Sequence, residues 1–191
     1  MEENTTDGAM EAAELRAIIV RAKEGEKEAF GVLYSRFFTP LYRYVLYRVG
    51  SRGDAEELTQ EVFLKAYAAF GRYDADRATT PLPYFFTIAR NAIIDWRRKQ
   101  RTLVLEPDLM HTFSDDQPLP DGVAIRAEDA NALYRALDKL SEDMREALLL
   151  RFMGGLSGRE VADQMGKSED AIRQLQSRAM RILKEKLGEI K

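Results

Sequence analysis

The chain has 191 residues, enough for one ordinary domain or two small ones, and its formal net charge is −3 at pH 7. Because it has no cysteine, it has no disulfide framework, no thiolate metal site and no cysteine nucleophile. The near-neutral charge argues against a protein that coats nucleic acid without regard to sequence. No stretch reaches the ~20 apolar residues of a membrane span, and the polar start MEENTTDG does not resemble a signal peptide. We therefore expect a cytoplasmic protein without membrane insertion.

Helical periodicity runs almost without interruption over two parts of the chain, and signals for β-strands are nearly absent. We predict an all-α protein with two small helical domains, residues 11–101 and 128–191, after a disordered N-terminus at residues 1–10. Residues 102–127 are rich in Pro and Asp and lack a sustained apolar stripe, which predicts a flexible acidic linker between the domains. Residues 90–101, just before this linker, are basic. The small net charge is therefore the sum of a basic segment and the acidic segment that follows it.

The segment DAEELTQEVFLKAYAAF predicts a helix that begins with Asp54 as its cap and Glu57 as the partner of that cap. One face of this helix is apolar and would be buried. Another face gathers three polar side chains and one leucine, namely Glu57, Gln60, Glu61 and Leu64. An apolar Leu64 within a polar stripe is either a docking point for a partner or an ordinary exposed leucine.

A further helix is predicted from Tyr84 to Arg101, after Pro81 and Pro83, which suit the start of a helix. One side is an apolar stripe that would face the core. The other side carries polar and basic residues, namely Thr87, Arg90, Asn91, Arg97, Arg98 and Arg101. Arginines on one exposed face form an electrostatic footprint for phosphates, but basic residues near a helix C-terminus are also an ordinary solvated surface. From this helix alone, both interpretations stay open.

Residues 157–181, SGREVADQMGKSEDAIRQLQSRAMR, predict two short helices with a tight turn between them. Ser157 and Glu160 form an S-x-x-E capping box at the start of the first helix. Gly166 suits the left-handed turn that ends it, and Ser168 caps the second helix. Helix, turn and longer helix are the outline of a helix-turn-helix. Just upstream lies an apolar run that could form a partner surface but is predicted to be core: Leu148, Leu149, Leu150 and Phe152.

Taken in order, these segments resemble the bacterial sigma factors of the extracytoplasmic-function (ECF) type, in the sigma-70 family. FGVLYSRFFTPLYRYVLYRV is similar to the first part of their promoter-melting domain, and DAEELTQEVFLKAYAAF is similar to their polymerase-docking helix. PYFFTIARNAIIDWRRKQR resembles the helix that reads the opened minus-ten element. Residues 137–183 resemble the domain that recognises the minus-thirty-five element. The resemblance covers nearly the whole chain, and the ordered set of motifs is more specific than any single one.

The resemblance implies a sigma factor, with neither catalytic residues nor a cofactor, that binds core RNA polymerase and promoter DNA. Polymerase would dock on Asp54, Glu57, Gln60, Glu61 and Leu64. The minus-ten element would be melted and held by Thr87, Arg90, Asn91, Arg97, Arg98 and Arg101. The loop at about residues 71–81 would help to take a flipped base. The minus-thirty-five element would be read in the major groove by Ser168, Asp170, Arg173, Gln174, Ser177, Arg178 and Arg181.

The resemblance also implies regulation by an anti-sigma factor that holds the two domains in a closed arrangement and hides the docking and DNA surfaces. One departure from the family pattern concerns the start of the second helix of the helix-turn-helix. Glu169, Asp170 and Arg173 stand where relatives often have a small or hydroxylated residue and a lysine. The two acids suit the positive end of the helix dipole but repel phosphate, so the promoter sequence stays open.

Three other kinds of protein fit part of the sequence. A helix-turn-helix transcriptional regulator that acts without polymerase docking explains residues 157–181 but not the aromatic and arginine cluster of residues 84–101. A helical adaptor that binds only proteins leaves every basic face as solvated surface. An enzyme is the weakest alternative, because the single histidine, His111, stands in the linker. The paired acids Asp115 and Asp116 have no other ligand cluster around them, so no metal site is predicted.

Overall fold

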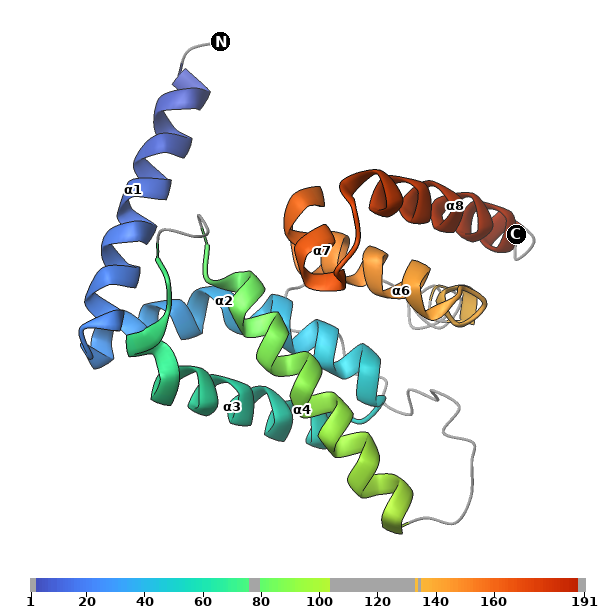
Figure 1. The fold of residues 1–191 in the computed structure, drawn as a ribbon, viewed down its shortest axis with the longest axis horizontal. Helices are drawn as coiled ribbons and strands as arrows, with labels where there is room; N and C mark the ends of the chain where they lie inside the picture. The colour runs from blue at the N-terminus through green and yellow to red at the C-terminus, as the bar shows by residue number, and fades with distance from the viewer. Residues whose placement is uncertain (1–2, 76–79, 104–132, 134, 189–191) are drawn as a thin grey trace.

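The computed structural model describes residues 3–75, 80–103, 133 and 135–188. Every regular element in these ranges is a helix, which confirms the all-α prediction. The first group of elements comprises α1 (Glu3–Lys23), α2 (Lys27–Val49), α3 (Arg52–Ala69), the 3-10 helix η1 (Phe70–Arg72) and α4 (Leu82–Leu103). The second group comprises α6 (Glu142–Leu148), the π-helical turn η2 (Leu149–Met153), α7 (Gly158–Met165) and α8 (Glu169–Gly188). Figure 1 shows the two groups as separate bundles, with the second beside α2 and α4.

The bounds of α1 and α4 can be set beside the predicted ends of the first domain. α1 begins at Glu3, within residues 1–10, whose predicted disorder stays a prediction. At the other end, α4 continues to Leu103, two residues beyond the predicted boundary. The rest of the predicted linker, 104–127, lies outside the described residues.

The start of α3 also differs from the prediction, in which Asp54 was the cap. The helix begins at Arg52, and the Ser51 hydroxyl accepts a hydrogen bond from the Asp54 backbone N–H at 3.4 Å. Ser and Asp cap helices about equally well, and Ser51, three residues before Asp54, takes this role here. Asp54 instead occupies the first turn, where the helix dipole favours a carboxylate.

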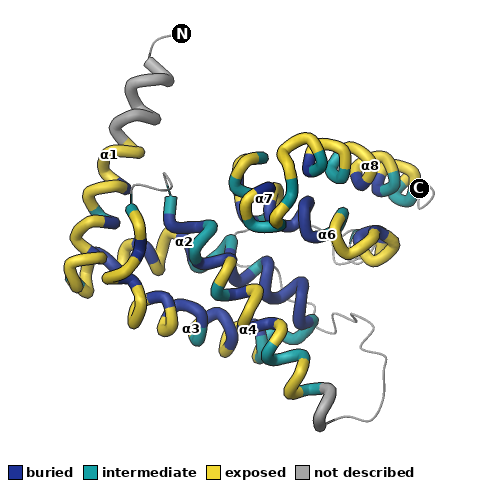
Figure 2. Tube along the Cα trace, in the orientation of Figure 1, coloured by how far each residue is buried: buried dark blue, intermediate teal, exposed yellow. Residues whose placement is uncertain are grey.

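Aromatic rings fill the core of the first group. Phe85 of α4 is fully buried, and its ring centroid lies 5.1 Å from that of Phe63 on α3 and 5.8 Å from that of Phe37 on α2. Phe70 of η1 stacks nearly parallel to the same ring at 6.3 Å. Figure 2 shows that the buried parts of α2, α3 and α4 face one another. Each such ring stabilises the fold by roughly 1.5–3 kcal/mol through burial alone.

The second group folds as the capping and periodicity signals predict. The Ser157 hydroxyl accepts from the Glu160 N–H, and the Glu160 carboxylate accepts from the Ser157 N–H, which completes the capping box. Gly166 has a φ of 62° in the left-handed region, and Ser168 caps the next helix by accepting from the Ala171 N–H. The inward positions of α8 are buried: Ile172, Ala179 and Leu183.

The predicted burial of Phe152 is wrong. Leu148, Leu149 and Leu150 are buried, but Phe152 is 68% exposed. The cause is η2, in which residues 149–153 follow a π-helical rather than an α-helical winding. A π-helical turn holds more residues than an α-helical one, so it shifts the register of the side chains after it. The sequence carried no separate signal for this change.

The two groups of helices touch in the described structure. η2 packs on α2, and α7 packs on the first turns of α4. Gly154, which ends η2, lies so close to Phe86 that a Cβ on this residue would stand 2.8 Å from the ring. Only glycine permits this approach without displacing the ring. In the part of the chain that the structure describes, no helix is both long and apolar enough to cross a membrane.

The turn between α7 and α8 yields a stability prediction. Gly166→Ala should lower the free energy of unfolding by about 1–2 kcal/mol, because its positive φ is strained for a residue with a Cβ. Gly158→Ala is the matched control, since Gly158 has ordinary helical backbone and open space around the added methyl group. Urea unfolding followed by circular dichroism measures both, and equal stability of the two variants would contradict the prediction.

Candidate nucleic-acid and partner interfaces

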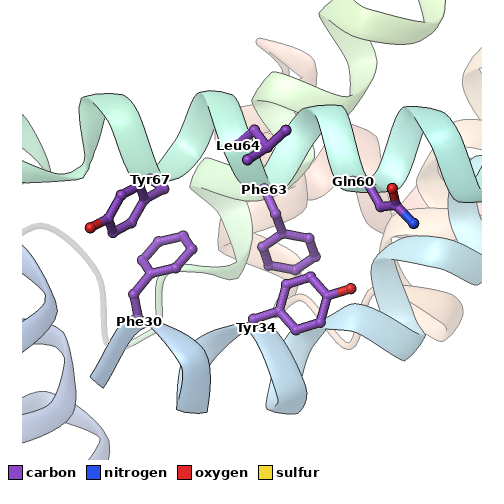
Figure 3. A pocket seen from close by; sticks show the side chains of 6 residues that line it. All are labelled: Phe30, Tyr34, Gln60, Phe63, Leu64 and Tyr67. Carbon is purple, nitrogen blue, oxygen red and sulfur yellow. The ribbon is translucent and has the colours of Figure 1, made fainter. Parts of the chain in front are cut away.

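The outer face of α3 carries the predicted docking residues beside an apolar groove. Leu64 is 70% exposed, and Glu57 and Gln60 are exposed as well, whereas Asp54 and Glu61 are half-buried. Figure 3 shows the groove from close by, between α2 and α3. Aromatic rings and two rim residues line it: Phe30, Tyr34, Gln60, Phe63, Leu64 and Tyr67. An apolar floor with a polar rim has the composition of a protein-binding surface.

Sequence reasoning missed the aromatic part of this groove. Tyr67 stands three residues after Leu64 and shares its side of α3, so helical spacing could have found it. Tyr34 comes from α2, thirty residues earlier in the chain, and only the packing of its ring 4.8 Å from Phe63 brings it to the groove. No local pattern in the sequence predicts the contact between Tyr34 and Phe63.

The polar face of α4 is only partly free. Thr87, Arg90, Asn91 and Arg98 are exposed, and the apolar Ile94 among them is 53% exposed. Arg98 lies 3.1 Å from Asp95 in an exposed ion pair, which contributes little to stability. Arg101 lies in the last turn of α4, beyond the side chains that the structure describes.

Arg97 departs from its predicted place on this face. Its guanidinium is half-buried and donates a hydrogen bond of 3.1 Å to the backbone carbonyl of Arg48, at the end of α2. Burial, and then the nearby charge of Arg48, lower the pKa of Arg97. Arg97 therefore links α4 to α2 instead of facing solvent, because the helical register of α4 places the Arg97 side chain beside the end of α2.

The aromatic residues in and just before the first turns of α4 are mostly buried. Phe85 and Phe86 are fully buried. Tyr73 stacks on Phe70 at 5.1 Å, and its hydroxyl donates to the Thr80 carbonyl at 3.2 Å. Burial raises the pKa of Tyr73 to about 12. Of the loop predicted to take a flipped base, residues 76–79 lie outside the described part of the chain.

The outer face of α8 presents polar side chains at recognition-helix spacing. While α8 packs its apolar side on α6 and α7, six predicted residues are exposed on the other side: Asp170, Arg173, Gln174, Ser177, Arg178 and Arg181. Ser168 serves as the helix cap. Arg173 bonds to Asp170, and this hydrogen bond, followed by the charge of Asp170, raises the pKa of Arg173. Such an exposed pair is weak, so Arg173 can exchange it for a base or a phosphate.

A buried polar cluster that the sequence did not single out lies where the two groups of helices meet. Arg48 of α2 is only 7% exposed and pairs with Glu142 and Glu146 of α6, at 2.8 and 3.2 Å. The Tyr44 hydroxyl donates to Glu146 at 2.8 Å, and burial, then the charge of Glu146, raise the pKa of Tyr44 far above its usual range. Neither this cluster nor any other group of side chains among the described residues brings together three or more acidic or histidine residues that could hold a metal ion.

Comparison with known proteins identifies the family of the chain. A family model described as sigma-70 region 2 matches residues 33–102, and one described as sigma-70 region 4 matches residues 130–183. The ECF RNA polymerase sigma factor SigX of Bacillus subtilis is 30% identical over 165 residues, which cover 83% of each chain. The chain belongs to the ECF sigma factors of the sigma-70 family.

Other relatives and solved structures agree with this assignment. The ECF RNA polymerase sigma factor BldN of Streptomyces coelicolor is 35% identical over 174 residues, which are 91% of this sigma factor and 66% of BldN. CnrH, solved in complex with the cytosolic domain of CnrY, has a TM-score of 0.70 at 24% identity and covers 92% of this chain and 98% of that one. RpoE of Bartonella quintana, solved with the anti-sigma factor NepR, has a TM-score of 0.66 over 83% and 96% of the two chains. These two structures show the same fold.

The activity of the protein follows from the family. As an ECF sigma factor, it binds core RNA polymerase and promoter DNA and directs promoter-specific initiation of transcription. It is not an enzyme. The region 2 match spans α2 from residue 33 through α3 and most of α4, so a regulator that acts without polymerase is the wrong alternative.

The two neighbouring arginines of α4 should behave differently. Arg97→Ala should lower the free energy of unfolding by about 1–2 kcal/mol, because it leaves the Arg48 carbonyl without its charged donor. Arg98→Ala should change it by less than about 0.5 kcal/mol, because Arg98 is exposed and its ion pair with Asp95 lies on the surface. Urea unfolding compares them, and a larger loss for Arg98→Ala would show that Arg97 does not fasten α4.

Proposed function

We propose that the sigma factor docks on core RNA polymerase through the groove between α2 and α3. The observation that carries this assignment is Leu64, whose side chain is 70% exposed at the edge of an aromatic-lined groove. A partner that buried Leu64 would gain about 2 kcal/mol from this side chain alone. Gln60, Glu57, Glu61 and Asp54 supply the polar rim, and Tyr34 and Tyr67 extend the docking surface beyond the residues that the sequence suggested.

The exposed face of α4 holds the minus-ten element in this proposal. Arg90 and Arg98 contact phosphates, and Thr87 and Asn91 lie on the same side of the helix, where they can bond a base of the opened strand. Arg97, although predicted for this role, acts through the position of α4 instead. Unpairing a base costs a few kcal/mol, which phosphate contacts and polymerase binding offset without ATP.

The outer face of α8 reads the minus-thirty-five element in the major groove. Arg173 and Gln174 are exposed in the first turns of the helix, where a recognition helix contacts base edges. Arginine pairs with guanine and glutamine with adenine, each through two hydrogen bonds. Ser177, Arg178 and Arg181 lie farther along and contact the DNA backbone.

We further propose that the protein acts in the cytoplasm and is regulated by an anti-sigma factor. RpoE of Bartonella quintana was solved with such an inhibitor, NepR, and CnrH was solved with the cytosolic domain of CnrY. The exposed docking groove offers an inhibitor an apolar surface that polymerase would otherwise occupy. Purification of the sigma factor from its own cells, followed by mass spectrometry of bound proteins, tests this part of the proposal.

The docking groove can be tested by placing an arginine inside it and, in a second variant, outside it. Leu64→Arg should weaken binding to core polymerase at least tenfold, because it places a cation in an apolar contact. Val32→Arg is the control, since Val32 is 48% exposed on α2 but does not line the groove. Fluorescence anisotropy with labelled sigma factor measures both affinities. Equal affinity of Leu64→Arg and Val32→Arg would move the docking site elsewhere.

The recognition helix can be tested by its ability to discriminate between DNA sequences. Arg173→Ala or Gln174→Ala should each reduce the preference of the holoenzyme for its minus-thirty-five element by about 1–3 kcal/mol. Polymerase binding should stay intact. Lys184→Ala, an exposed change near the end of α8, should leave the preference unchanged. In-vitro transcription from a promoter library with a randomised upstream element measures the preference, and an unchanged preference in both α8 variants would exclude direct readout by these side chains.

A further inference from the structure

Among the described residues, the buried polar cluster links the two domains through charged side chains. Arg48 and Tyr44 come from α2 of the first domain, and Glu142 and Glu146 come from α6 of the second. Tyr44 is fully buried, and Arg48 and Glu146 are each 7% exposed. A second, weaker link lies beside it, where the Tyr47 hydroxyl donates to Asp138 at 3.3 Å. Closure of the two domains is what buries these charges.

The energetics of the cluster suit a contact that opens and closes. Removing two charges from water costs several kcal/mol per ion, and their mutual attraction repays this cost only when hydrogen bonding is complete. Here it is incomplete, because Arg48 Nε is buried without a hydrogen-bond partner and Glu146 Oε2 has only its 3.2 Å ion pair with Arg48. Water would satisfy both atoms on opening. The cluster therefore specifies the closed arrangement without making it very stable.

In the closed arrangement, α7 also contacts part of the α4 surface proposed to bind DNA. Gln164 of α7 donates from Nε2 to the Pro83 carbonyl at 2.5 Å and to the Thr87 hydroxyl at 2.9 Å. Thr87 lies on the α4 face proposed above for the minus-ten element. In the closed arrangement, α7 therefore stands at the start of the helix that would meet opened DNA.

The closed arrangement also cannot span a promoter. Elements centred near −10 and −35 are separated by about 25 base pairs, which is roughly 85 Å along B-form DNA. Helix α8, with 20 residues, is only about 30 Å long, and its domain is in direct contact with α2 and α4. The two reading surfaces cannot reach both elements until the domains separate.

We propose that Tyr44, Arg48, Glu142 and Glu146 form an intramolecular latch that keeps the free sigma factor closed without an inhibitor. Binding of core polymerase opens the latch by holding the domains apart. The latch rests on the contacts between the two domains, and only its consequence for Thr87 rests on the proposed DNA assignment. An inhibitor would then stabilise an arrangement that the chain already favours.

The distance between the domains tests the latch directly. Because the chain has no cysteine, Val32→Cys on α2 and Lys184→Cys on α8 place two dyes on exposed positions of different domains, outside the docking groove. Single-molecule energy transfer then reports closed and open molecules in the full-length free protein. The protein without latch changes should be mainly closed, and core polymerase should convert it to the open state.

Two conservative changes remove parts of the latch. Glu146→Gln removes the buried negative charge, and Tyr44→Phe removes one hydroxyl without changing the ring. Each should raise the ratio of open to closed molecules about tenfold or more, because a buried charge loses its partner or a charged hydrogen bond is lost. Glu26→Gln is the matched control, since Glu26 pairs with Arg21 on the surface of the first domain alone. It should leave the ratio unchanged.

The outcomes separate the latch from the proposed function, because neither polymerase nor DNA is needed to measure the ratio. Circular dichroism checks that each variant is folded. Gln164→Ala, a change at the half-buried edge of the contact, provides a variant that does not disturb the core and should raise the ratio severalfold. The proposal is wrong if the free protein is mainly open. It is equally wrong if the folded latch variants and Gln164→Ala show the same ratio as Glu26→Gln.

Discussion

The burial of one ring, Phe85, fixes the geometry on which the functional surfaces of the first domain depend. It packs against rings from α2, α3 and η1, so it joins all the elements that surround α4 in this domain. With this face of α4 turned inward, Arg90, Asn91 and Arg98 are turned outward. The same packing turns Phe63 inward and leaves Leu64, the next residue of α3, exposed at the groove. The docking groove and the basic face are thus consequences of one core.

In the second domain, the arrangement of α7 and α8 depends instead on how the ends of these helices are capped. A helix-turn-helix leaves little room between α7 and α8, so the backbone groups at the helix ends must be satisfied locally. Ser157 and Glu160 satisfy the start of α7, Gly166 allows the sharp turn, and Ser168 satisfies the start of α8. Ile172 is then held against the core, and the opposite face of α8 carries Arg173 and Gln174 into solvent.

The contact between the domains has a different character from either core. It combines the close approach of Gly154 to Phe86 with charged groups that are only partly satisfied. A purely apolar interface of this kind would favour a permanent association, whereas buried charges regain their hydration when the interface opens. A sigma factor must hold two DNA elements far apart at the promoter, so an interface that can be opened suits its function.

The sequence by itself determined the elements whose causes are local. Capping residues, glycine in the turn and the 3.6-residue period predicted α7 and α8, and the ordered motifs indicated the family and hence the activity. Tertiary structure decided what depends on residues far apart in the chain. It turned Arg97 toward the Arg48 carbonyl, rotated Phe152 outward through a π-helical turn, and brought Tyr34 beside Leu64. It also paired Arg48 with Glu146 across about a hundred residues. Periodicity tells which side of a helix is apolar, but which partner covers each side is decided only when the helices pack, because the pairing energy belongs to neither segment alone.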